Sequence, residues 1–225
     1  MIRQLVNDGI EYKNDKKKSD ANYTDGELDG KYNDWYENGQ IKTDANYTDG
    51  ELDGKYNDWY ENGQIKTDAN YKDGAGTYLQ FYENRQLKIE GDYKDGERDG
   101  KWTEWYGNGQ IKFELNYKDG DLVSTTRYNY YDNGQIESKK NYKDDRLNGK
   151  STFWNKNGQK FGEGKYKDGK ADGNWMWWNK KGQKDEELNY KDGDLVNKTI
   201  FKYSYFSGNL KSEKKYEDGK CISGC

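Results

Sequence analysis

The pattern in this chain that comes closest to a chemical site is a pair of Asp-Gly dipeptides, for example from Asp25 to Gly30. Closely spaced carboxylates are the ligands that Ca²⁺ prefers, which raises the possibility of a cation loop. A calcium loop places its oxygens at alternate positions, as in Asp-x-Asp-x-Asp, and that spacing is missing here. Two successive turn signals explain the pattern better, so we predict no metal site.

Catalytic chemistry has little support. The chain contains no His, which removes the commonest general base and metal ligand. Gly-x-Gly occurs at 107–109 and 162–164, but inside hairpins that no helix follows, so a phosphate-binding loop is not expected. Carboxylates recur with a repeat, whereas a catalytic pair should interrupt it. We therefore predict that the protein is not an enzyme and needs no cofactor.

The only two cysteines, Cys221 and Cys225, lie in the terminal sequence CISGC. Their spacing allows a small disulfide in an oxidising compartment, and a reduced, frayed tail is the alternative. Two thiols alone make a poor zinc site.

A repeat must position all of these residues. The seventeen letters KYNDWYENGQIKTDANY begin at Lys31 and again at Lys55. One tyrosine recurs at intervals of 22 to 26 residues, at positions 23, 47, 71, 93, 117, 142, 166, 190 and 216. A fixed period in the twenties indicates an array of units that contact mainly their neighbours. We predict one array over 1–225, with an N-terminal half-repeat at 12–22, about eight repeats over 23–220 and a tail at 221–225.

Each repeat carries two turn signals, Asn-Gly and Asp-Gly, which favour two-residue hairpin loops. A nine-residue strand (40–48) and an eleven-residue strand (51–61), joined by such loops, account for the period. The two extra residues of the longer strand indicate a wider Asp-Gly loop or a bulge. The predicted fold is all-β, an elongated single-layer antiparallel meander of about eight hairpins.

A two-residue loop at 108–109 would place Tyr106 opposite Ile111, Glu104 opposite Phe113, and Trp102 opposite Leu115. That face is nearly all apolar, and the other face is polar except for one aromatic stripe. The stripe consists of Trp35, Trp59, Phe81, Trp105, Tyr130, Trp154, Trp178 and Tyr205. A one-residue bulge would turn the stripe toward the apolar side, and the sequence leaves this open.

Composition limits the partners. Mean hydropathy is -1.51 and aromatics make up 16% of residues, so few aliphatic side chains remain for a thick core. A net charge of -4 argues against nucleic acid or an anionic membrane as a partner bound by bulk charge. No apolar run is long enough for a membrane span or a signal peptide. We expect a cytoplasmic protein if Met1 is the native start, and a secreted or cell-surface protein if a signal peptide was trimmed.

The segment from Gly30 to Lys42, GKYNDWYENGQIK, followed by Tyr47-x-Asp49-Gly50, resembles the variant MORN repeat (membrane occupation and recognition nexus). The resemblance recurs eight times over residues 12–220. It implies a single-layer β-sheet used as a binding scaffold, without catalytic residues. Bacterial proteins of this kind are often labelled as antitoxin components of toxin–antitoxin pairs. Departures from the pattern include a two-residue deletion at Ala75–Gly76, and Lys160 and Lys184 at the usual Ile position.

The repetition is interrupted most strongly by an aromatic patch, which consists of Phe153, Trp154, Phe161, Trp175, Met176, Trp177 and Trp178. Alternation places Trp175 and Trp177 on one face, and Met176 and Trp178 on the other. Large apolar groups on both faces of one thin sheet indicate a partner site. The leading hypothesis is a non-catalytic scaffold for a protein partner, with an antitoxin or immunity role implied by the resemblance. A carbohydrate or cell-wall binding array, and a structural spacer or self-associating rod with open sheet edges, are the alternatives.

Overall fold

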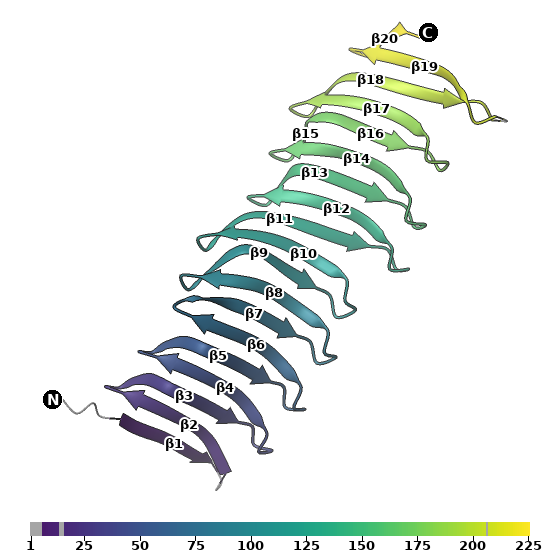
Figure 1. Ribbon diagram of the computed structural model, residues 1–225. Coiled ribbons are helices and arrows are strands. Elements are labelled where there is room, and N and C mark those ends of the chain that lie inside the picture. Colours follow the sequence, from purple (N-terminus) through teal and green to yellow (C-terminus); the bar gives the residue numbers. More distant parts are fainter. Residues whose placement is uncertain (1–5, 14–15, 206) are drawn as a thin grey trace. The chain divides into compact units, whose positions relative to one another are not determined.

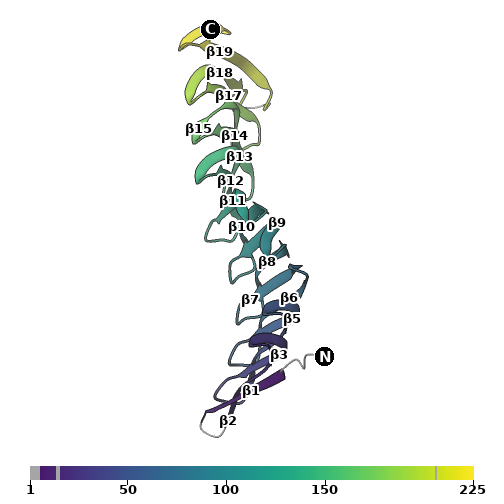
Figure 2. The ribbon, with the colours of Figure 1, turned by 90° about the vertical axis from the view of Figure 1, so that its left-hand side faces the viewer.

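The computed structural model describes residues 6–13, 16–205 and 207–225, and all regular structure in this part of the chain is β-strand. The chain divides into two compact units, Met1–Leu122 and Val123–Cys225, which we describe separately. In each unit the strands lie side by side in chain order and form one layer (Figures 1 and 2). The predicted all-β antiparallel meander is therefore confirmed.

The first unit is built from strands β1 to β10, and each pairs antiparallel with the next. Their bounds are β1 Val6–Lys13, β2 Lys16–Thr24, β3 Glu27–Trp35, β4 Ile41–Thr48, β5 Glu51–Trp59, β6 Ile65–Lys72, β7 Ala75–Phe81, β8 Leu87–Lys94, β9 Glu97–Trp105 and β10 Ile111–Lys118. β1 begins ahead of residue 12, where we predicted the half-repeat to start.

The second unit has the same pattern, with β11 starting two residues before the division. Its strands are β11 Asp121–Tyr130, β12 Ile136–Lys143, β13 Arg146–Trp154, β14 Lys160–Lys167, β15 Lys170–Ala171, β16 Gly173–Trp178, β17 Lys184–Lys191, β18 Asp194–Tyr203, β19 Leu210–Glu217 and β20 Lys220–Ser223. Neighbouring strands pair antiparallel, and β14 pairs with both β15 and β16. The predicted tail includes β20.

The Asp-Gly loops have the predicted two residues. Thr48 pairs with Glu51 across the loop, and Asp49 and Gly50 have φ of 49° and 80°. Positive φ at both positions is the type I′ geometry, which Asp and Gly tolerate better than other residues. The glycine of the second Asp-Gly dipeptide in this repeat has a different role. Gly54, with φ of 100°, lies in a bulge between the register Tyr47↔Leu52 and Ala45↔Tyr56. The extra residues of the longer strand thus form a bulge.

The Asn-Gly loops differ from the prediction. The Gly109 N–H donates to the Tyr106 carbonyl at 2.9 Å, and Tyr106 pairs with Gln110 rather than Ile111. The loop therefore has three residues, with glycine in the left-handed position. A bulge at Lys112 then restores the expected register, because Ile111 pairs with Trp105 but Phe113 pairs with Glu104. The predicted partners are correct beyond the bulge and wrong by one residue at the loop.

Candidate functional site

Strand alternation and the observed register define two faces in each unit. The tyrosine face carries the repeated tyrosine, such as Tyr47, together with Tyr56 and Ala45. Ala45 is buried and pairs directly with Tyr56, so a small residue on one strand makes room for a ring on the next. The Trp35 face carries Trp35 and its partner Ile41. The sequence left open whether a bulge would turn Trp35 toward the tyrosines. The bulge lies on the partner strand β4, so Trp35 stays on the face opposite the tyrosines.

The tyrosine face of the first unit contains an aromatic cluster around Trp102. This side chain is fully buried and contacts Tyr78, Tyr93 and Tyr117 at centroid distances of 5.7, 5.1 and 6.2 Å. Its indole N–H donates to the Asp92 carbonyl at 3.1 Å. The ring lies directly against Gly91, where a Cβ atom would overlap it.

The aromatic patch in the second unit repeats this construction on its tyrosine face. Trp175 and Trp177 stack at 5.9 Å, and each stacks on Phe153 at 6.3 and 6.1 Å. Phe161 stacks on Trp177 at 6.0 Å. Gly162 and Gly164 lie under Trp177 and Trp175, where a Cβ would overlap either ring. This packing explains the Gly-x-Gly at 162–164: these glycines accommodate indole rings.

Only part of the patch is accessible. Trp175 is 5% exposed and its indole N–H donates to the Lys165 carbonyl, so this residue belongs to the packing of the sheet. The other six members are half-buried. Trp175 therefore positions the patch, and a direct contact with a partner would involve its half-buried neighbours.

The Trp35 face of the patch carries Trp154, Met176 and Trp178. The Lys160 ammonium lies 4.3 Å from the centroid of the Trp178 ring, within cation–π range. Lys160 and Lys150 each contact the Glu163 carboxylate at 3.0 Å. Partial burial opposes ionisation of Glu163, but hydrogen bonds from the two ammonium groups outweigh it and lower its pKa. The face thus combines half-buried apolar side chains, including two tryptophans, with a charged surround.

The aromatic stripe runs along the Trp35 face with one correction. Trp35, Trp59, Phe81, Trp105, Tyr130, Trp154 and Trp178 all end their strands opposite the residue that starts the next. These side chains are half-buried. Tyr205 does not belong to the stripe, because Tyr203 pairs with Leu210 in the equivalent place. Tyr205 follows the strand and is 85% exposed. The long last repeat shifted our alignment by two residues.

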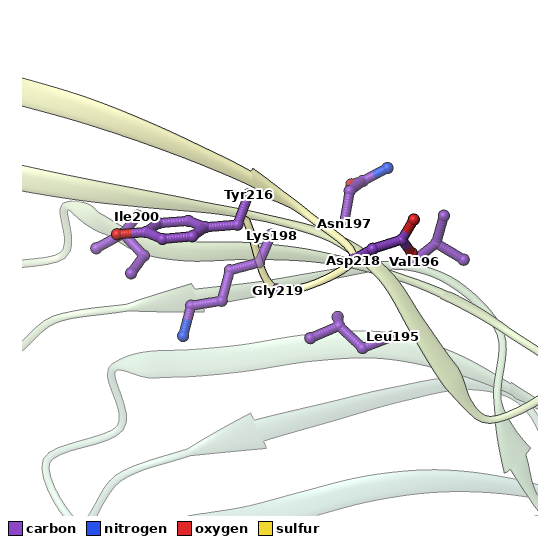
Figure 3. A pocket seen from close by; sticks show the side chains of 8 residues that line it. All are labelled: Leu195, Val196, Asn197, Lys198, Ile200, Tyr216, Asp218 and Gly219. Carbon is purple, nitrogen blue, oxygen red and sulfur yellow. The ribbon is translucent and has the colours of Figure 1, made fainter. Parts of the chain in front are cut away.

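Two surface grooves add candidate sites that sequence reasoning missed. In the second unit, Leu195, Val196, Ile200 and Tyr216 line a small groove of about 310 Å³ beside Lys198 (Figure 3). In the first unit, a groove of about 690 Å³ lies between the repeated tyrosines and the Asp-Gly loops. The deletion at Ala75–Gly76 was the available signal for the second groove.

The two cysteines are joined by a disulfide, with Cα atoms 6.2 Å apart. Gly224 lies between them, directly against the backbone of Glu213 in β19. Among the described residues, no group of three or more Cys, Asp or Glu side chains has the geometry of a metal site. None of them forms a helix long and apolar enough to cross a membrane.

Comparison with known proteins supports the class of repeat. Four segments match the family model of the MORN repeat variant: residues 28–49, 52–73, 98–119 and 126–144. The first three segments each span a strand, an Asn-Gly loop and the next strand. The chain is therefore a β-hairpin repeat protein in which four segments match the MORN repeat variant. Such repeats indicate a scaffold for binding.

No curated protein matches the chain. Chains in the crystal structures of TcdB2-TccC3-Cdc42 and TcdB2-TccC3-TEV align with it at 10% and 9% identity, with TM-scores of 0.35 and 0.31. The alignments cover 96% and 95% of this chain, which spans only 14% of the length of each of those chains. Similarity at this level carries no argument about fold or function.

Proposed function

We propose that this protein is a non-catalytic scaffold that binds a protein partner through the Trp35 face of the aromatic patch. The observation that carries the proposal is the placement of Trp154, Met176 and Trp178. Their neighbour Trp175 packs into the opposite face, while these three side chains remain half-buried on a face of charged residues. A folded partner should bind where the repeats differ most: Trp154 and Trp178 continue the stripe, and Met176 takes the place that Asn33 and Asn57 have in the first repeats.

The class of partner that we propose is a toxin, which this chain would neutralise as an antitoxin or immunity protein. The support for this finer assignment is the resemblance of the repeats to bacterial antitoxin components. The protein encoded beside this chain in its genome is the first candidate partner.

The test compares Trp178→Ala with Trp35→Ala in a titration against that neighbouring protein. The two sites are well matched, because a lysine ammonium lies over each ring, at 4.3 Å for Trp178 and 5.0 Å for Trp35. Loss of a central interface tryptophan should cost about 2–4 kcal/mol of binding free energy, and the Trp35 change much less. Circular dichroism must show that both variants fold. No loss at either site would exclude this face as the interface.

A carbohydrate ligand is the second candidate, and the ring stack of Phe153, Phe161 and Trp177 favours it. Neighbouring rings with interplanar angles of 21–42° present a broad apolar surface on which a sugar can lie. For this ligand, Trp177→Ala should abolish retention on a cell-wall polysaccharide and Trp178→Ala should not. Equal losses at Trp178 and Trp35 would indicate a polymer that contacts every repeat.

A further inference from the structure

The two units have opposite charge, although the whole chain is close to neutral. Residues 1–122 contain 27 Asp and Glu against 17 Lys and Arg, a net charge of -10. Residues 123–225 contain 15 Asp and Glu against 21 Lys and Arg, a net charge of +6. The first unit therefore attracts cations, and a basic partner would approach it preferentially.

This unit also contains the larger groove, which we call the tyrosine groove. Its walls are rings and an aliphatic side chain, and its rim is acidic. The lining residues are Tyr47, Leu52, Tyr71 and Tyr93, with Glu51, Asp73, Asp95 and the loop glycines Gly50, Gly74 and Gly96. Burial raises the pKa of Tyr71 from 10.0 to about 12.

The groove is open because β7 is short. β7 has seven residues, whereas β5 and β9 have nine, and the pairing of β6 with β7 lacks the bulge seen in the neighbouring repeats. Gly76 pairs with Tyr71 at the place that Leu52 and Arg98 take in the neighbouring repeats. A Cβ atom at Gly76 would overlap the Asn70 carbonyl, so this place holds no side chain.

The next repeat shows what fits such a place. The Arg98 guanidinium lies 4.3 Å from the Trp102 centroid and 5.4 Å from that of Tyr117. It also donates a hydrogen bond to the Tyr117 hydroxyl at 3.1 Å. Burial opposes the charge, but hydrogen bonds to Tyr117 and Tyr93 outweigh it and raise the pKa of Arg98. Stacking and a phenol acceptor are thus the contacts that this face offers to a guanidinium.

The chain's own cations leave most of the acidic rim uncompensated. Lys72 contacts Asp53 at 3.3 Å and Asp73 at 3.7 Å. Arg98 of β9 pairs with Tyr93, on the opposite side of this tyrosine from Tyr71. Among the described ion pairs, neither Glu51 nor Asp95 has a basic partner.

We propose that the tyrosine groove binds an arginine side chain of a basic, extended segment of a partner protein. The guanidinium lies in the groove against the rings of Tyr71 and Tyr93, which contact each other edge to face with centroids 5.8 Å apart, and donates to a tyrosine hydroxyl as Arg98 does to Tyr117. Glu51, Asp73 and Asp95 attract the basic residues that flank it. This site lies in the first unit, so it is separate from the aromatic patch and does not depend on the function proposed for it.

The test uses the full chain and fluorescein-labelled peptides of four Gly-Arg or four Gly-Lys repeats, titrated by fluorescence anisotropy. The Gly-Arg peptide should bind at least fivefold more tightly, because a planar guanidinium stacks on rings better than an ammonium does. Equal affinities would show that the peptides bind through their charge alone, and would overturn the proposal. The absence of binding would overturn it too.

A variant that fills the groove provides the second arm. Leu52→Arg places a guanidinium in the groove in the way that Arg98 fills the later place, and should weaken Gly-Arg binding about tenfold. Glu61→Gln makes the same change of charge at the exposed Asn-Gly edge and should weaken it less than twofold. If Leu52→Arg does not fold, the double variant Asp73→Asn and Asp95→Asn should weaken binding by a similar factor. Equal effects of the groove variants and Glu61→Gln would contradict the site.

Discussion

At the residue scale, the size of each large ring on the tyrosine face matches the residue that it covers. Ala45 and Ala69 pair with Tyr56 and Tyr78, whereas the larger Trp102 lies on Gly91. Trp175 lies on Gly164 in the same way. In a single layer, a buried indole requires a neighbouring strand without a side chain at that point. The sequence contains these pairs at a spacing of eleven residues or, at the deletion, nine.

The Gly91–Trp102 pair predicts a compensating effect. Gly91→Ala should lower the free energy of unfolding by about 1–3 kcal/mol, because the new methyl group overlaps the indole. Adding Trp102→Tyr should recover part of the loss, since it recreates the Ala45–Tyr56 pair. Chemical denaturation of the single and double variants measures this. Gly107→Ala is the control, because a Cβ there has no atom within 4 Å. Additive losses in the double variant would contradict the size match.

Glu163 predicts a dependence of stability on pH. Its pKa is lower in the folded chain than the ordinary value of 4.5, so its contribution is present above that value and is lost as pH falls through the folded pKa. Glu163→Gln should therefore reduce stability at pH 7 by about 0.5–1 kcal/mol and have a smaller effect at pH 3. Thermal melts at both values test this, with the exposed Glu217→Gln as the control. An equal effect at both values would exclude the charge as its cause.

At the element scale, the sequence predicted which segments form strands and which dipeptides form turns. It did not predict the third residue of the Asn-Gly loops or the bulge at Lys112. The longer loop shifts the register by one residue and the bulge shifts it back, so most strand partners are the same as for a two-residue loop. It also did not predict the tyrosine groove, which depends on a deletion and on Arg98 in the next repeat. Tyr205 was misassigned because alignment by period fails where a repeat changes length.

Hairpins are also joined at the Asn-Gly edge by side chains. The Tyr60 hydroxyl donates to the Phe81 carbonyl at 2.8 Å, and the Tyr131 hydroxyl to the Trp154 carbonyl at 2.8 Å. Tyr60→Phe and Tyr131→Phe should each lower the free energy of unfolding by about 0.5–1.5 kcal/mol. The two bonds share no residue, so the double variant should show the sum. Unchanged denaturation midpoints would show that water replaces these bonds.

At the scale of the whole molecule, the repeated letters allow an exact excision. Removal of residues 31–54 joins Gly30 to Lys55, and the resulting sequence around the junction is the native one. The shortened chain should keep its β-sheet spectrum and lose a modest part of its stability, because each hairpin contacts mainly its neighbours. Removal of only 31–42 should abolish folding, because it joins the start of β3 to β4 without a loop and reverses the direction of every later strand. Circular dichroism and thermal melts distinguish the two, and a folded half-period deletion would contradict the hairpin repeat.

The pairing of each strand with its neighbour in the chain has a consequence for biosynthesis. When a strand emerges from the ribosome, the strand with which it pairs has just been synthesised a few residues upstream. No strand therefore depends on a distant segment for its pairing. Loop closure over such short spans carries a small entropic penalty. Apart from the outer edge of β1, the growing sheet then exposes one unpaired edge, at its newest strand. Synthesis itself thereby limits the exposure of open edges to aggregation.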